Sequence, residues 1–128
     1  GMSRPVGALF HVPHGLSNAM LLPTVTAFSR EAALERYGEA AVLMGWADAG
    51  ASLETQSQAL IEGLSGLNQR LAVPSPAAYG IDRDAWFAAL PTMAQQAQAS
   101  GSPANNPRVP TLEEMEGLYA ALWGNEGA

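Results

Sequence analysis

Residues 52–71, which read SLETQSQALIEGLSGLNQRL, decide the fold class of this 128-residue chain. Gly63 and Gly66 lie inside this stretch, where each costs about 1 kcal/mol relative to alanine if the segment is helical. Either these glycines mark the close approach of another helix or they are simply tolerated, and we favour tolerance. The apolar side chains recur at the three-and-four spacing of one α-helical face: Leu53, Leu60, Ile61, Leu64, Leu67 and Leu71.

Two further helices are predicted on the N-terminal side of this stretch. Residues 16–28 are apolar almost all round, which is typical of a helix buried on most of its circumference. Pro23 removes a backbone donor there, so we expect a kink or a short break. Residues 30–44 show helical spacing, with Ser29 as the expected N-cap and Gly45 as the expected stop.

Two more helices are predicted on the C-terminal side. Asp82 is the expected cap of a fourth helix, which Pro91 should kink or restart. Thr111-Leu112-Glu113-Glu114 has the pattern of a capping box that opens a last helix through residue 123. Residues 75–80 and 100–110, rich in Gly, Pro, Ser and Asn, are expected to be loops.

No segment alternates apolar and polar residues in the manner of a strand. The sequence therefore predicts an all-α fold of about five helices in a compact bundle, with residues 1–128 forming a single helical domain. Gly1 before Met2 is expected to be left by cleavage of a tag, and residues 125–128 are expected to be a frayed tail.

The composition excludes several classes of function. The net charge is −6, and the six basic residues are dispersed arginines, so we expect no nucleic-acid partner. No cysteine is present, which excludes disulfides and thiolate metal sites. Charged residues make up only 14% of the chain, below the roughly 25% of an ordinary soluble domain. With neither a membrane-length apolar run nor a secretory signal, we expect a cytoplasmic protein without membrane contact.

Two histidines, His11 and His14, are the only candidate metal ligands that stand out. Pro13 and Gly15 make this segment a loop that leads into a helix, and two imidazoles do not complete a metal site. The alternatives are ordinary polar residues at a helix N-terminus, or a small anion site that includes Arg4.

Other catalytic patterns are absent from the sequence. Glu31, Glu35 and Glu39 are interpreted as an exposed helix face rather than as paired catalytic carboxylates. No serine lies in a nucleophile elbow, and no glycine-rich phosphate loop follows a strand. The catalytic residues therefore stay unassigned.

Residues 4–23, RPVGALFHVPHGLSNAMLLP, closely resemble a signature of the iron-containing alcohol dehydrogenases, whose pattern includes Pro-His-Gly-x-x-Asn-Ala-x-Leu-Leu-Pro. The family's C-terminal stretch is matched by Asn106-Pro107-Arg108, by Thr111 to Glu114 and by Leu118-Tyr119. Such proteins have an N-terminal dinucleotide-binding domain and a C-terminal helical domain. The resemblance implies that this chain corresponds to part of that dehydroquinate synthase-like helical domain.

The resemblance assigns a role to one residue only. His14 aligns with the last histidine ligand of the family's Fe(2+) or Zn(2+), whereas the other ligands lie upstream of this chain. Arg4 stands where the family usually has a further histidine near the nicotinamide, and a guanidinium cannot relay a proton near pH 7. The family's metal polarises the alcohol oxygen and hydride passes to NAD(P). We expect no cofactor in the isolated chain and no dehydrogenase activity.

Two hypotheses of different classes follow. In the first, the chain is a truncated remnant or a split subunit of an alcohol dehydrogenase and needs a separate dinucleotide-binding polypeptide. In the second, it is a non-catalytic helical interaction module whose apolar faces bind a partner or drive formation of a homo-oligomer.

Overall fold

The computed structural model describes residues 2–124, and within them it is all-α with no strand, as predicted. Eight α-helices and two 3-10 helices occur in this part of the chain, which is more than the five helices expected. In order they are α1 (Ser3–Phe10), α2 (His14–Ser29), η1 (Arg30–Ala32), α3 (Leu34–Leu43), α4 (Leu53–Arg70), α5 (Pro76–Tyr79), α6 (Arg83–Ala88), α7 (Leu90–Ala99), η2 (Ser102–Asn105) and α8 (Leu112–Leu122).

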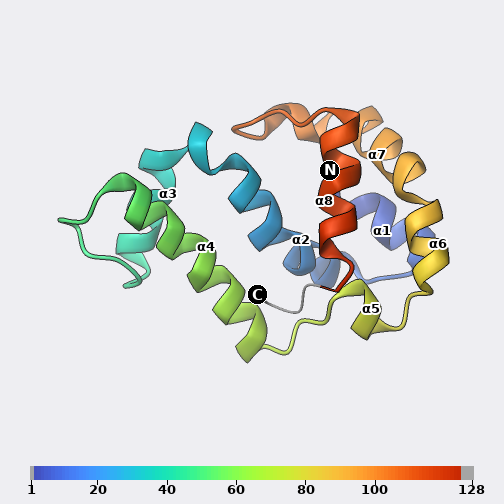
Figure 1. Ribbon diagram of the computed structural model, residues 1–128, viewed down its shortest axis with the longest axis horizontal. Coiled ribbons are helices and arrows are strands. Elements are labelled where there is room, and N and C mark those ends of the chain that lie inside the picture. The colour runs from blue at the N-terminus through green and yellow to red at the C-terminus, as the bar shows by residue number, and fades with distance from the viewer. Residues whose placement is uncertain (1, 125–128) are drawn as a thin grey trace.

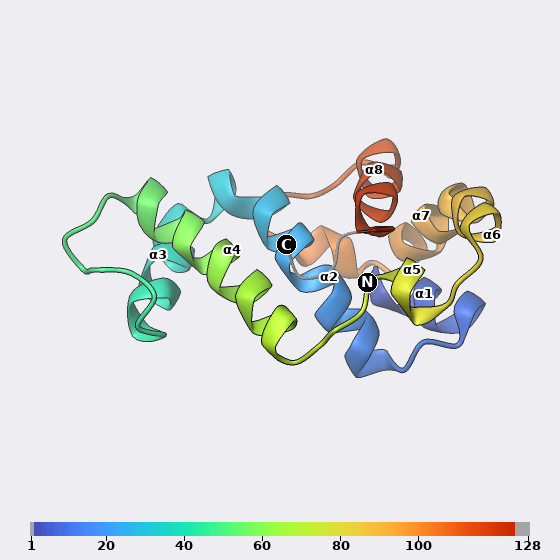
Figure 2. The same cartoon turned by 60° about the horizontal axis from the view of Figure 1, so that its bottom comes forward.

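Helix α2 runs through the middle of the molecule (Figure 1). On one side, α3 and α4 form a hairpin that contacts the rest of the protein mainly through α4 against α2. On the other side, α1, α7 and α8 pack together, and both α1 and α8 also contact α2. Figure 2 shows the hairpin at one end of the molecule and α6 and α7 at the opposite end.

The main core lies under α6, α7 and α8 and is built around Trp86, Met93, Met115 and Tyr119, all fully buried. The Trp86 Nε1 donates to the carbonyl of Tyr119 at 3.1 Å, and the Tyr119 hydroxyl donates to the carbonyl of Met2 at 2.6 Å. Burial raises the pKa of Tyr119. Because both polar tips have partners, these large rings can be buried without an unpaired donor.

Two predicted helix caps, Asp82 and Thr111, are confirmed, and Ser52 caps α4 without having been predicted to do so. The Ser52 Oγ accepts from the Thr55 backbone N–H at 3.1 Å, and an Asp82 carboxylate oxygen accepts from the Ala85 N–H at 2.9 Å. Thr111 and Glu114 form the reciprocal capping box at the start of α8. Each cap satisfies donors that the first turn of a helix leaves unpaired.

Two predicted helix ends are also confirmed. Helix α3 ends at Leu43, and Gly45 follows with φ of 76°, a conformation that glycine adopts without strain. The helix capped by Asp82 stops and restarts near Pro91, so that α6 and α7 are separate elements.

Helix α1 was not predicted. Pro5 and Gly7 interrupt its short sequence pattern, but Ser3, Pro5 and Val6 are buried against the neighbouring helices. Tertiary packing therefore overrides weak intrinsic propensity here. The next helix also begins at His14 rather than at residue 16.

Of the kink or short break predicted at Pro23, the break is wrong, because α2 continues through this residue, and the kink stays a prediction. Proline has no N–H to donate to the carbonyl of Ala19, one turn earlier. The side-chain amide of Asn68 on α4 donates to that carbonyl instead, at 2.8 Å. A neighbouring helix thus supplies the hydrogen bond that proline removes.

Ser29 does not cap a helix over residues 30–44, as was predicted. Its side chain makes no cap hydrogen bond, and its hydroxyl instead accepts from the Asn106 amide at 2.5 Å. Residues 30–32 form the 3-10 helix η1, and α3 begins only at Leu34. The Ser29 hydroxyl is therefore bonded to Asn106, which is distant in sequence, rather than to the first turn of a helix.

The predicted loops over residues 75–80 and 100–110 each contain a short helix. Ser75 caps α5 by accepting from the Ala78 N–H at 3.1 Å, and Pro76 occupies the first helical position. The 3-10 helix η2 lies in the second loop.

The tolerance interpretation of Gly63 is wrong. A Cβ on Gly63 would lie 2.1 Å from the Trp46 ring, so the glycine is needed for the indole to pack on α4. At Gly66 the nearest atom to such a Cβ is 3.7 Å away, which is ordinary contact and agrees with tolerance.

The predictions for Gly1 and for a frayed tail at residues 125–128 lie outside the described residues, and the assignment of residues 1–128 to a single domain stays a prediction. None of the described helices combines the length and the apolar character needed to cross a bilayer.

Candidate functional site

His14 is the first residue of α2, and its side chain is exposed. Pro13 precedes it in extended conformation, and the Ser17 hydroxyl, which is buried, donates to the Pro13 carbonyl at 3.1 Å. The His14 Nε2 lies 3.2 Å from the side-chain amide of Asn18, one turn along the helix. The local fold therefore presents the imidazole outward and orients it with an amide.

His11 lies in a different local structure. It caps the C-terminus of α1 in the left-handed region, with φ of 57°, and its N–H donates to the Gly7 carbonyl at 3.0 Å. The Tyr79 hydroxyl donates to its carbonyl at 3.4 Å. Its backbone thus joins α1 to α5, which is a structural role for this position.

Arg4 lies in the first turn of α1 and is exposed. Seven residues along a helix separate it from His11, which corresponds to about 10 Å at 1.5 Å per residue. The structure therefore gives no support to an anion site that uses Arg4 and His11 together.

The residues present do not form a complete metal site. Within residues 2–124 no group of three or more His, Asp or Glu side chains is close enough to hold an ion. Protein sites for zinc and iron use three or four such donors. His14 is a single accessible donor, and a stable site here would need ligands that these residues do not supply.

An apolar cleft of about 490 Å³ lies beside α2. The start of α1, one face of α2, the segment 102–110 and Leu118 of α8 surround it. The polar residues that line it are all uncharged, and none of its described lining residues is Asp, Glu, Arg or His. The polar lining residues are Ser3, Asn18, Ser102, Asn105 and Asn106.

Asn18 connects the cleft to His14, because its amide contacts the imidazole and its side chain also lines the cleft. Leu21, Leu22 and Val25 continue the apolar wall along α2. A molecule with a polar end near His14 and an apolar remainder along α2 would match this distribution of groups.

Sequence reasoning named His14 as the candidate metal ligand, which stays a prediction, and it gave no indication of the cleft. The cleft walls come from Met2 and Ser3, from α2 and from residues 102–118, which only tertiary structure brings together. The apolar character of residues 16–28 was the one available signal, since part of that surface faces the cleft instead of the core.

The described residues thus form an all-helical fold with two exposed histidines, His11 and His14, and an apolar cleft that no charged side chain lines. The comparisons give its class: residues 1–123 match the Fe-containing alcohol dehydrogenase family, C-terminal. The chain belongs to this family, as the resemblance of residues 4–23 implied.

The chain is similar to lactaldehyde reductase of Escherichia coli, with 34% identity over 124 residues that cover 96% of this chain and 31% of the relative. It is 36% identical to a 1-propanol dehydrogenase of Salmonella typhimurium, covering 94% of this chain and 34% of that protein. A solved structure of a 1,3-propanediol oxidoreductase superposes with a TM-score of 0.87 at 27% identity, covering 95% of this chain and 31% of that one. The chain thus spans about a third of the length of these relatives.

Proposed function

We propose that this chain is the metal-contacting helical part of an iron-dependent, NAD(P)-linked alcohol dehydrogenase and is inactive alone. The observation that carries the proposal is the exposed imidazole of His14 at the start of α2, within the family's Pro-His-Gly signature. The relatives named above, oxidoreductases of lactaldehyde, propanol and propanediol, support the reaction class.

His14 would supply one ligand to the metal, and a separate polypeptide would supply the remaining ligands and the dinucleotide-binding domain. In this family the bound metal polarises the oxygen of an alcohol or carbonyl substrate. Arg4, in place of the family's usual histidine, keeps its charge near pH 7 and does not exchange a proton. The residues of this chain therefore bind and orient without completing a catalytic centre.

The apolar cleft would receive the alkyl part of the substrate. Its lining is uncharged, which disfavours charged substrates because they would lose hydration without a compensating partner. Asn18 lies between the imidazole and the cleft and would hold the ring in place while its neighbours contact the alkyl chain.

The role of His14 can be tested in a fusion of this chain to the N-terminal remainder of the E. coli lactaldehyde reductase. We expect iron-dependent oxidation of an alcohol that His14→Ala reduces by at least about 100-fold, since loss of a ligand removes both metal and Lewis acid. His11→Ala is the matched control and should leave turnover within about twofold. An active, iron-loaded fusion that His14→Ala does not impair would contradict the proposal.

A second candidate function is the non-catalytic interaction module. Several large apolar side chains are exposed on the described surface, including Leu43 at 87%, Leu71 at 66% and Val109 at 60%. Such residues would become buried in a homo-oligomer or against a separate dinucleotide-binding subunit. Sedimentation velocity over a hundredfold range of concentration tests this, and a clean monomer throughout would count against self-association.

A further inference from the structure

The segment of residues 100–110, here called the strap, forms one wall of the apolar cleft. It leaves α7 at Ser100, crosses the end of α2 and returns to α8, as the orange part of the ribbon shows in Figure 1. Most of its side chains are exposed, and only Pro110 is buried. Beyond the contact of η2 with α7, little apolar burial holds the strap in place.

Asn106 makes the first polar contact between the strap and α2. Its side-chain amide donates to the Ser29 hydroxyl at 2.5 Å and to the Arg108 carbonyl at 2.6 Å. One amide therefore joins the end of α2 to the turn of the strap that carries Arg108.

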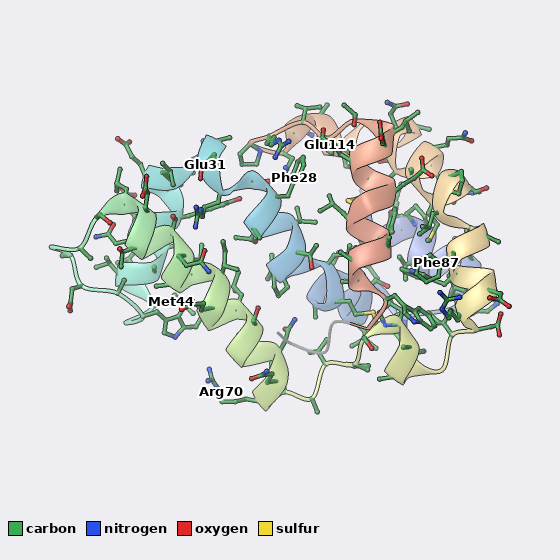
Figure 3. All side chains as sticks on the ribbon, in the orientation of Figure 1. Phe28, Glu31, Met44, Arg70, Phe87 and Glu114 are labelled. Atoms are coloured by element: carbon green, nitrogen blue, oxygen red, sulfur yellow. The ribbon has the colours of Figure 1, made fainter. Side chains whose placement is uncertain are left out.

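Arg108 makes the second contact, with two partners from different elements. Its guanidinium lies 4.0 Å from the centre of the Phe28 ring and donates to the Phe28 carbonyl at 3.4 Å. The same group pairs with the Glu114 carboxylate at 2.5 Å. Figure 3 shows Phe28 at the end of α2 and Glu114 at the start of α8, on the same side of the molecule.

The partners of Arg108 are themselves fixed. The capping box holds the Glu114 carboxylate on the backbone of Thr111, and Phe28 lines the cleft from α2. A planar guanidinium can stack on a ring and bind a carboxylate at once, which an ammonium group does less well. The Asn-Pro-Arg sequence therefore forms a clasp between α2, the strap and α8.

We propose that Arg108 is a positioning residue that holds the strap against Phe28 and Glu114 and thereby keeps the apolar cleft shaped for an uncharged ligand. The ligand class, an alcohol or aldehyde with an alkyl chain, rests on the proposed function. The clasp itself does not, because it follows from contacts within this chain.

Amide hydrogen exchange of the full chain tests the clasp without any ligand. The N–H groups of Ala104 and Asn106 donate to Gly101 and Pro103 within the strap and report its opening. In Arg108→Gln we expect both to exchange about threefold to tenfold faster, since a ring stack and a half-exposed ion pair are lost together. The resonances of the Phe28 ring should shift in the same variant.

Two further variants separate the two contacts of Arg108. Glu114→Gln removes the charge but keeps a side chain that can complete a capping box, and Arg108→Lys keeps the ion pair but not the planar stack. In each variant, the amide exchange rate of the strap should lie between that of the wild type and that of Arg108→Gln. The matched control is Arg83→Gln, which removes another arginine stacked on a phenylalanine, Phe87 at 5.0 Å, and paired with Asp84. It should leave strap exchange unchanged.

Binding of 1-hexanol, followed by NMR shifts, then tests the effect on the cleft. The dissociation constant should rise about threefold to tenfold in Arg108→Gln, because the closed conformation of the strap is less populated and the apparent affinity falls with it. It should stay unchanged in Arg83→Gln. If Arg108→Gln shows the same strap amide exchange and the same 1-hexanol dissociation constant as Arg83→Gln, the proposed role of Arg108 is contradicted. If the wild-type chain does not bind hexanol while Arg108→Gln still accelerates exchange, the ligand assignment of the proposed function fails and the clasp stands.

Discussion

At the scale of single residues, Glu114 shows how one carboxylate serves two contacts. The backbone N–H of Thr111 lowers its pKa most, desolvation opposes this as the next largest effect, and the charge of Arg108 lowers the pKa further. A carboxyl whose pKa is lower in the folded state contributes stability above its unfolded pKa. That contribution disappears as the pH falls through the folded value.

We therefore expect the start of α8 to lose stability when the pH falls below the ordinary glutamate value of 4.5. In Arg108→Gln the pKa of Glu114 should rise but remain below that ordinary value, because the Thr111 N–H still donates. Titration of the side-chain carboxyl resonance by NMR measures this directly. An unchanged pKa in the variant would mean that the ion pair is not maintained in solution.

The two glycines of α4 give a matched pair of predictions. Gly63→Ala should lower the free energy of unfolding by about 1–3 kcal/mol, because the new methyl group meets the Trp46 ring. Gly66→Ala should raise it by about 0.5–1 kcal/mol through helix propensity alone, since its surroundings are open. Urea unfolding followed by tryptophan fluorescence checks both signs, and a stabilising Gly63→Ala would refute the packing of Trp46 described here.

At the scale of helices, α2 depends on α4 for one of its hydrogen bonds. The Asn68 amide satisfies the Ala19 carbonyl that Pro23 leaves free. Removing the amide leaves a part-buried carbonyl without its partner, a loss of about 1–2 kcal/mol.

A double-mutant cycle isolates this contact. Asn68→Ala should be destabilising by about 1–2 kcal/mol in the wild type but by at least about 0.5 kcal/mol less in a Pro23→Ala background. In that background the new N–H of residue 23 donates to Ala19 and makes the Asn68 bond dispensable. Equal losses in both backgrounds, measured by chemical denaturation, would show that Asn68 stabilises the fold in another way.

These elements also show which features of the fold the sequence predicts. The caps at Asp82 and Thr111 are local, with partners three residues away, and they were predicted correctly. Ser29 and Pro23 were misjudged because their partners, Asn106 and Asn68, lie far along the chain. Local patterns thus predict helix starts, whereas tertiary partners decide how a polar group or a proline is accommodated.

At the scale of the whole molecule, the candidate site also combines a feature of local sequence with features that only tertiary structure creates. His14 lies in a contiguous signature and was identified from it, while the cleft joins α2 to the strap and could not be foreseen. The strap contributes through Asn106 and Arg108, which the family pattern marked without giving a reason. The structure supplies that reason as contacts with Ser29, Phe28 and Glu114.

Among residues 2–124, His14 is the proposed metal donor and one apolar cleft lies beside α2, and the chain spans about a third of the length of its relatives. Its central property, in this account, is that it is catalytically incomplete. We propose that the ligands that complete the metal centre and the residues that bind the dinucleotide come from a separate polypeptide.

The most direct test is the rate of NAD(P)H formation by the purified chain alone, with ferrous iron, NAD(P) and 1-propanol in excess. We predict no turnover above a control without protein, at any chain concentration. Robust turnover that depends on the chain and on iron would contradict the account, because it would require a complete active centre within this polypeptide.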